Sequence, residues 1–212
     1  MLPHSRIYLA TTNPGKVREF QEAAQNLDLA LEPLPGMHNL TPAIEDGDTF
    51  EQNARIKAEY YSQFTPGHLV MAEDSGLSVD ALDGAPGVYS ARYAAILQCG
   101  PKTHENSDDP SNNRALIAQL ERLPAEKHTG KYVCTIALAQ DNKTLATFTG
   151  EAHGELLTTP RGAQGFGYDP LFYFPALSRT FAELAVEQKR EYSHRGKAFR
   201  YFLSWYATTG KL

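Results

Sequence analysis

The chain has 212 residues, of which 42% are hydrophobic and 21% are charged, a composition that predicts a folded protein and excludes a disordered one. Its formal net charge of −5 disfavours a protein whose task is to coat DNA or RNA, because such proteins need a basic face. No stretch approaches the roughly 20 apolar residues that a membrane span needs. We therefore expect a single domain over residues 1–212, with neither a nucleic acid nor a membrane as its partner.

Apolar periodicity predicts the elements of the first half of the chain. Short apolar runs predict buried strands at residues 6–11, 69–72 and 77–79. Helical spacing of apolar side chains predicts helices over residues 17–27 and 49–64. The second strand is expected to end where Glu73 and Asp74 begin, so that charge lies at a strand break.

The second half opens with a polar stretch at residues 100–113, which predicts a long surface loop. A helix is predicted over residues 112–123, and a final helix after Ser193. Strands are predicted at residues 132–139, 145–149 and 171–174, the first two as an antiparallel pair joined near Asp141. Alternating helices and strands followed by a strand pair predict an α/β fold with a mixed sheet.

The first segment with chemical character lies between the first strand and the first helix. Its residues are Thr11, Thr12, Asn13, Pro14, Gly15 and Lys16. Free N–H groups and the dipole at a helix start favour a phosphate, and a lysine adds charge. The segment lacks the G-x-x-x-x-G-K-[ST] pattern, and Asn-Pro-Gly is also a common structural turn.

Carboxylates form the second feature. Glu73 and Asp74 end a buried strand, where open α/β sheets place their ligands, and Glu45 precedes the second helix. Oxygen ligands of this kind suit Mg²⁺, which needs only one or two carboxylates besides substrate phosphates and water. A solvated turn at Glu73, or helix capping by the acidic residues 45–48, explains the same residues without a metal.

Two later segments combine aromatic and cationic groups. The first contains Phe166, Gly167, Tyr168 and Asp169. An aromatic face there could stack on a base while Asp169 accepts hydrogen bonds, although a tight turn with core aromatics explains the same residues. The second contains Lys189, His194 and Arg195 before a helix start, as donors to a purine carbonyl oxygen or as a solvated basic face.

In their order and spacing, these segments resemble the inosine triphosphate pyrophosphatase family, also described as purine nucleoside triphosphate pyrophosphatases acting on non-standard bases. The resemblance runs almost from end to end. It rests on T-T-N-P-G-K at 11–16, E-x-G-x-T-F-x-x-N-A-x-x-K-A at 45–58, D-S-G-L at 74–77 with G-A-P-G-V-Y-S-A-R at 84–92, G-F-G-Y-D-P at 165–170, and S-H-R at 193–195. It implies a homodimer of two-lobed α/β subunits, a mixed central sheet flanked by helices, and an active-site cleft between the lobes.

The resemblance also implies a role for each segment. The loop at residues 11–16 and Lys57 would hold the triphosphate, and Ser75 would add a hydrogen bond. Residues 166–169 would grip the nucleoside, while Lys189, His194 and Arg195 would face the base. Glu45 and Glu73 would bind Mg²⁺, and Asp74 would accept a proton from water and also contact the metal.

The expected reaction is the hydrolysis of inosine, deoxyinosine and xanthosine triphosphates to the monophosphate and pyrophosphate, which cleans the nucleotide pool. Two alternatives remain open: a pyrophosphatase for modified pyrimidine nucleotides, and a nucleotide-binding regulator without catalysis. Cys99 and Cys134 form no C-x-x-C pair, and no secretory signal is evident, so we expect a reducing compartment, the cytoplasm.

Overall fold

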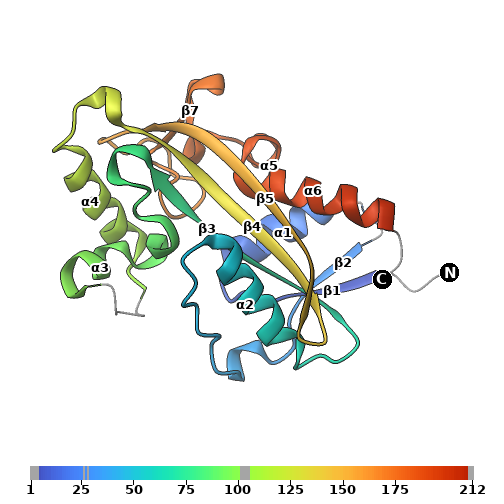
Figure 1. Ribbon diagram of the computed structural model, residues 1–212. Helices are drawn as coiled ribbons and strands as arrows, with labels where there is room; N and C mark the ends of the chain where they lie inside the picture. Colours follow the sequence, from blue (N-terminus) through green and yellow to red (C-terminus); the bar gives the residue numbers. More distant parts are fainter. Residues whose placement is uncertain (1–4, 26, 28, 101–105, 210–212) are drawn as a thin grey trace. The chain divides into compact units, whose positions relative to one another are not determined.

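The computed structural model describes residues 5–25, 27, 29–100 and 106–209 (Figure 1). Seven strands form one mixed sheet in the order β2-β1-β3-β4-β5-β6-β7. The strands are β1 (Ser5–Leu9), β2 (Leu29–Pro33), β3 (Leu69–Val79), β4 (Thr129–Gln140), β5 (Lys143–Leu156), β6 (Phe172–Phe174) and β7 (Arg179–Thr180). The predicted α/β fold with a mixed sheet is confirmed.

The sheet changes strand direction along its order. β1 pairs in parallel with both β2 and β3, whereas β5 with β6 and β6 with β7 are antiparallel. Neighbouring β4 and β5 are joined by Asp141 and Asn142 alone, both with positive φ (49° and 62°), which is the two-residue turn of an antiparallel hairpin. The predicted hairpin is therefore confirmed.

Six α-helices accompany these strands in the described part of the chain. They are α1 (Pro14–Ala24), α2 (Phe50–Ser62), α3 (Tyr93–Cys99), α4 (Asp109–Leu120), α5 (Val186–Tyr192) and α6 (His194–Thr209). α1 begins three residues before the predicted start, because Pro14 suits the first helical position and Asn13 caps it. None of the helices in the described residues has the length and apolarity to cross a membrane.

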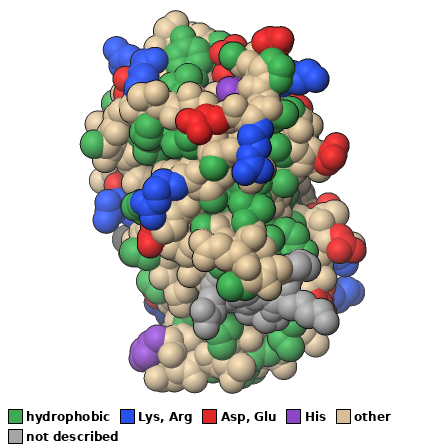
Figure 2. All heavy atoms as spheres, turned by 90° about the vertical axis from the view of Figure 1, so that its left-hand side faces the viewer, with side chains coloured by type: hydrophobic (Ala, Val, Ile, Leu, Met, Phe, Trp, Pro, Cys, Tyr) green, Lys and Arg blue, Asp and Glu red, His purple; other side chains and the backbone are tan. Residues whose placement is uncertain are grey.

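The chain divides into two compact units. The first comprises Met1–Asp74, Cys134–Gly150 and His194–Leu212, and the second comprises Ser75–Val133 and Glu151–Ser193. Acidic and basic side chains are interspersed with apolar ones on the face drawn in Figure 2.

The first unit has a hydrophobic core on each face of its strands. One core joins α1 and α6, which pack side by side (Figure 1), to side chains such as Leu69 and Met71 of β3. The other joins α2 to side chains such as Val70 and Ala72 of the same strand. Successive residues of β3 thus alternate between the α1/α6 face and the α2 face.

The second unit has a core of its own. α3 and α4 pack against each other, and the core draws side chains from β3, α4, β4, β5 and β6. Tyr132, Phe172 and Phe181 form an aromatic group in which the ring centroids lie 4.7–5.8 Å apart.

Two expectations are corrected. The strand predicted to break at Glu73 runs without interruption from Leu69 to Val79, because the buried carboxylates have cationic partners on both faces. The polar stretch 100–113 is not all loop: α4 begins at Asp109, capped by Asp108, whose side chain accepts the Ser111 N–H at 2.7 Å. Residues 101–105 of that stretch lie outside the described part.

Candidate active site

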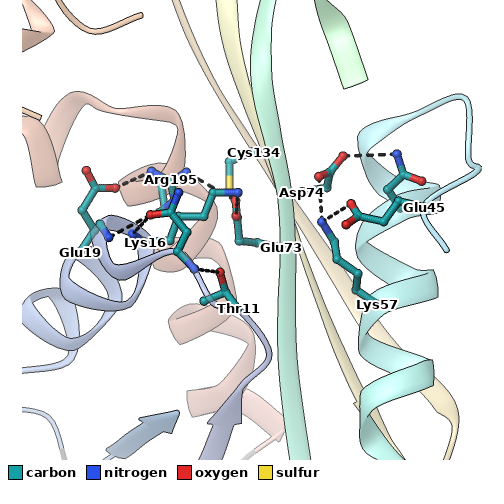
Figure 3. Close-up of polar contacts among 12 residues, drawn as sticks. Thr11, Lys16, Glu19, Glu45, Lys57, Glu73, Asp74, Cys134 and Arg195 are labelled. Carbon is teal, nitrogen blue, oxygen red and sulfur yellow. Dashed lines mark hydrogen bonds and ion pairs between the residues drawn. The ribbon is translucent and has the colours of Figure 1, made fainter. Parts of the chain in front are cut away.

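The adjacent carboxylates of β3 lie on opposite faces of the strand. Figure 3 shows Glu73 beside Lys16 and Arg195, and Asp74 beside Lys57 and Glu45. Strand alternation is the cause: Glu73 continues the face of Met71, and Asp74 continues the face of Ala72. The three acids expected as metal ligands are therefore not brought together; Glu45 and Asp74 meet, and Glu73 faces the other way.

On the α2 face, two carboxylates converge on one ammonium group. Lys57 Nζ lies 2.8 Å from Asp74 Oδ1 and 2.6 Å from Glu45 Oε2. Burial would lower the pKa of Lys57, but the charges of Asp74, Glu45 and Glu73 raise it, so the ammonium form persists. Lys57 is thus held as a buried cation next to Asp74.

Asp74 has the character of a proton acceptor. Its side chain is 11% exposed. Burial raises the pKa of Asp74 above its ordinary value, and the charge of Glu45 adds to this, whereas Lys57 and Lys16 oppose it. A carboxylate with a raised pKa is a stronger base than an ordinary aspartate.

Asn53, which lies one helical turn before Lys57, braces this cluster. Its Oδ1 accepts the Gly47 N–H at 2.9 Å, and its Nδ2 donates to Gly47 O at 3.3 Å and to Asp74 Oδ2 at 3.5 Å. The capping box of Thr49 and Gln52 fixes the start of the same helix. The loop that carries Glu45 is thereby tied to α2.

On the α1/α6 face, Glu73 is surrounded by cations. It is ion-paired with Lys16, and its Oε2 lies 3.5 Å from Arg195 and 3.3 Å from the Cys134 thiol. Burial would raise the pKa of Glu73, but Lys16 and Arg195 hold it well below its usual range. Arg195 is also ion-paired with Glu19 of α1. Glu73 therefore stays ionised and holds Lys16 and Arg195 in place.

The expected phosphate loop joins β1 to α1 and is closed by its own cap. Asn13 Oδ1 accepts the N–H groups of Gly15 and Lys16 at 2.9 and 3.2 Å, and Thr11 Oγ1 accepts the Asn13 N–H at 3.2 Å. Thr12 and Pro14 are exposed. A helix start and Lys16 thus coincide, but the N–H groups of Gly15 and Lys16, which the sequence interpretation treated as free, are bonded to the Asn13 side chain.

In the second unit, Asp169 joins the backbone of its own loop to α5. Its Oδ2 accepts the Phe166 N–H at 3.0 Å and pairs with Lys189 Nζ at 2.7 Å. Lys189 Nζ also lies 4.9 Å from the centroid of the Phe166 ring, a cation–π contact. Gly165 has φ +79°, and a Cβ there would collide with the Asp169 carboxylate. Phe166, Asp169 and Lys189 are brought together.

Other expected nucleoside contacts are placed differently. Tyr168 is 3% exposed in the core of the second unit, and its hydroxyl donates to Ser90 O at 2.8 Å. Its side chain is therefore a core residue, the explanation that the sequence left open for it. Arg195 belongs to the first unit with Glu73, and His194 is buried beside it at the start of α6. Ser75 follows Asp74 in β3 and is half-buried.

The sequence interpretation missed Glu19, Asn53 and Cys134. Helical spacing could have found two of them, because Glu19 lies three residues after Lys16 and Asn53 four residues before Lys57, on the same helix faces. Cys134 reads as an ordinary core residue of β4, and only the fold brings its thiol to Glu73.

The carboxylates of the site differ in their fit to a divalent cation. No group of three or more His, Cys, Asp or Glu side chains that could hold a metal occurs within the described residues. Glu45 and Asp74 nevertheless converge on one positive charge, that of Lys57. Two carboxylates completed by phosphate oxygens and water are a typical Mg²⁺ environment, so these residues fit the ion.

Comparison with known proteins identifies the family of the chain. The sequence model of the Ham1 family matches residues 7–205. Proteins named dITP/XTP pyrophosphatase from Acidobacterium capsulatum and Geobacter sulfurreducens are 44% and 45% identical, covering 93% and 92% of this chain and 96% and 92% of their own.

Solved structures give the same result for the fold. The Ham1 protein of Staphylococcus aureus superposes with a TM-score of 0.80 at 34% identity, covering 97% of this chain and all of its own. A HAM1 protein from Coxiella burnetii gives 0.82 at 35% identity, covering 96% and 99%. The chain belongs to the Ham1 family.

Proposed function

We propose that the protein hydrolyses non-standard purine nucleoside triphosphates, namely inosine, deoxyinosine and xanthosine triphosphates, to the monophosphate and pyrophosphate, and so cleans the nucleotide pool. The observation that carries the proposal is the buried Asp74 with a raised pKa beside Lys57 and Glu45. The names of the 40–45% identical relatives support the substrate class. The whole chain, residues 1–212, is proposed to be one pyrophosphatase domain.

Asp74 is proposed as the general base. It removes a proton from a water molecule that attacks the phosphorus next to the ribose, and the bond from that phosphorus to the pyrophosphate oxygen breaks. The raised pKa of Asp74 supports this role, because base strength helps proton removal. General base catalysis is worth about 10²–10⁴-fold in rate.

Lys57 and Lys16 are proposed to hold the triphosphate, with the loop of residues 11–16 and the Ser75 hydroxyl as further contacts. Lys57 is protonated and within reach of Asp74, so it keeps positive charge where negative charge develops. Lys16 is paired with Glu73, which fixes its position before a phosphate arrives. Glu73 is also retained as a metal ligand proposed from the resemblance alone.

Glu45 and Asp74 are the residues proposed to hold Mg²⁺. When bound, the ion would neutralise phosphate charge and stabilise the leaving pyrophosphate. Both carboxylates already face one cation, which supports the assignment.

Phe166, Gly167, Tyr168 and Asp169 are proposed to hold the nucleoside, with Phe166 providing the aromatic face and Tyr168 contributing its backbone only. Lys189 is proposed to donate to the 6-oxo group of the base, which adenine replaces with an amino donor. A site built for one hydrogen-bond pattern rejects the other by roughly 10⁴-fold. For His194 and Arg195 the proposal rests on the resemblance alone, because both are buried and Arg195 is paired with Glu19 and Glu73.

The same resemblance leads us to propose a homodimer in the cytoplasm. Sedimentation velocity of the purified protein tests the dimer: a single species at the mass of one chain would contradict it. Fractionation of source cells tests the location.

The deciding experiment is pyrophosphate release from inosine, xanthosine, guanosine, adenosine and pyrimidine triphosphates, with and without Mg²⁺. Release that depends on Mg²⁺ and is confined to inosine and xanthosine substrates is the expected result. Preference for modified pyrimidines would replace the base assignment, and binding without release would favour a regulator.

A further inference from the structure

The first turns of α4 hold the backbone of Gly167 in the segment proposed to bind the nucleoside. Asp109 Oδ2 accepts the Gly167 N–H at 2.6 Å, and Asn113 Nδ2 donates to Gly167 O at 3.1 Å. Asp109 and Asn113 are four residues apart, so they lie on the same face of the helix. Both hydrogen-bonding groups of one residue are thus bound by one helix.

α4 is itself anchored by a third side chain near its start. Asn112, which is 3% exposed, accepts the Ala94 N–H at 2.9 Å and donates to Ala91 O and Ser107 O at 3.1 and 3.3 Å. Two adjacent residues of the helix therefore bind different segments. Asn112 bonds to the segment before α4, and Asn113 bonds to Gly167.

The conformation of Gly167 can be fixed only by contacts to its backbone. This residue has no side chain, and its φ of +63° lies in the left-handed region, which other residues adopt at a cost. On one side Tyr168 is fixed in the core through its hydroxyl bond to Ser90. On the other side lies Phe166, the aromatic residue proposed to face the base, whose carbonyl carbon forms the peptide bond to the Gly167 nitrogen and whose N–H is bonded to Asp169.

We propose that Asp109 and Asn113 are positioning residues, which clamp Gly167 and thereby hold Phe166 in the orientation that binds the purine nucleoside. The inference rests on the proposed function and extends it to α4, whose first residues belong to the polar stretch 100–113. The charge on Asp109 makes its bond to the Gly167 N–H the stronger of the two. The bond from Asn113 fixes the same residue from its carbonyl side.

The test compares Asp109→Ala and Asn113→Ala with the wild-type protein. The KM for inosine triphosphate is expected to rise about 3- to 10-fold with kcat changed less than about twofold, because binding of the nucleoside is lost alike in ground and transition states. Inhibition by inorganic tripolyphosphate, which has no nucleoside, should stay unchanged. Asp109→Asn keeps an acceptor oxygen and should recover part of the loss.

Asp108→Ala is the matched control. Asp108 caps the same helix by accepting the Ser111 N–H, a bond within α4 and not to the segment 165–169. This variant should lower the melting temperature without raising the KM. An unchanged KM in both alanine variants, or a parallel loss of tripolyphosphate inhibition, would overturn the inference.

Failure of the proposed function can be distinguished from failure of this inference. If the proposed function is wrong, the wild-type protein would release no pyrophosphate from any nucleoside triphosphate. In that case hydrogen exchange of the peptide that contains residues 165–169 still tests the clamp. Faster exchange in both alanine variants, but not in Asp108→Ala, is expected. Equal exchange in all variants would show that Asp109 and Asn113 do not hold this segment.

Discussion

At the scale of single residues, two adjacent buried carboxylates differ in chemistry because their neighbours differ. Glu73 is nearly inaccessible between Lys16 and Arg195, which keep its pKa low. Asp74 shares a face with Glu45, and its pKa is raised. Burial penalises both charges, so the balance of partners decides which carboxylate has a lowered pKa and which has a raised one.

Replacing the proposed base isolates its chemistry. Asp74→Asn keeps the size of the side chain but cannot accept a proton, so kcat should fall by about 10²–10⁴-fold. Binding of inosine triphosphate, measured by calorimetry, should change much less. Asp80→Asn is the control, because the Asp80 side chain is bonded to Thr129 and is expected to leave kcat intact. Near-normal turnover in Asp74→Asn would remove Asp74 from the mechanism.

The raised pKa of Asp74 also predicts a pH dependence. The base acts when deprotonated, so kcat/KM should fall as pH decreases through a value above the ordinary aspartate pKa of about 4. Asn53→Asp places a further negative charge beside Asp74, which should raise the pKa of Asp74 further. The fall of kcat/KM should then occur at a higher pH than in the wild type, and kcat/KM should approach the wild-type value at alkaline pH.

Gln52→Glu provides the matched control for Asn53→Asp. It adds the same charge to the adjacent residue of α2, but the Gln52 side chain accepts the N–H groups of Asp48 and Thr49 at the helix start. Its acid limb should remain where the wild-type limb lies. Coincident profiles for wild type and Asn53→Asp would contradict the contact between Asn53 and Asp74.

At the scale of elements, the sequence predicted strands and helices best where apolar periodicity was strong. β1, α1 and α2 were all expected, and the β4–β5 hairpin was located by its turn. β3 was expected to break at Glu73, because periodicity alone treats charge as an interruption. The cations that allow the strand to continue come from Lys16, Lys57 and Arg195, which are distant in sequence.

The loop at residues 165–169 illustrates the same limit, because a motif does not tell which of its aromatic residues is core. Tyr168→Phe should lower the free energy of unfolding by about 1–3 kcal/mol, since it leaves Ser90 O without its donor. The KM for inosine triphosphate should stay within about twofold of wild type, because the ring faces the core.

Urea unfolding and steady-state kinetics check both parts of this prediction. Phe166→Leu is the comparison variant, with a raised KM and a smaller loss of stability, because the Phe166 ring contacts Lys189 rather than the core. A raised KM in Tyr168→Phe without loss of stability would assign the phenol to the substrate instead.

At the scale of the whole molecule, the site is assembled from segments that motifs located singly. Lys16, Glu45 and Asp74 were proposed from local patterns, and Lys57 from the family resemblance. How Glu73 and Asp74 divide between two faces depends on which helix covers each face of the sheet, and local patterns do not specify that. Glu19 and Cys134 join the network of Glu73 for the same reason.

The ion pairs of Glu73 should make the free energy of unfolding depend on pH in the acid range. The pKa of Glu73 is depressed in the folded protein, so its stabilising contribution is present above the unfolded glutamate pKa of about 4.3 and is lost as pH falls below it. Glu73→Gln leaves Lys16 and Arg195 without their shared partner, which should cost about 3–5 kcal/mol at neutral pH. The difference from wild type should shrink as pH falls below about 4.

Urea unfolding of both proteins across this pH range measures the difference directly. Glu32→Gln is the control, because the Arg6–Glu32 pair at 3.2 Å is about half exposed and such pairs contribute little. A difference between wild type and Glu73→Gln that stays constant with pH would show that the cost comes from packing. A difference that vanishes in acid would show that the charge of Glu73, fixed by cations from two helices, stabilises the fold around the proposed active site.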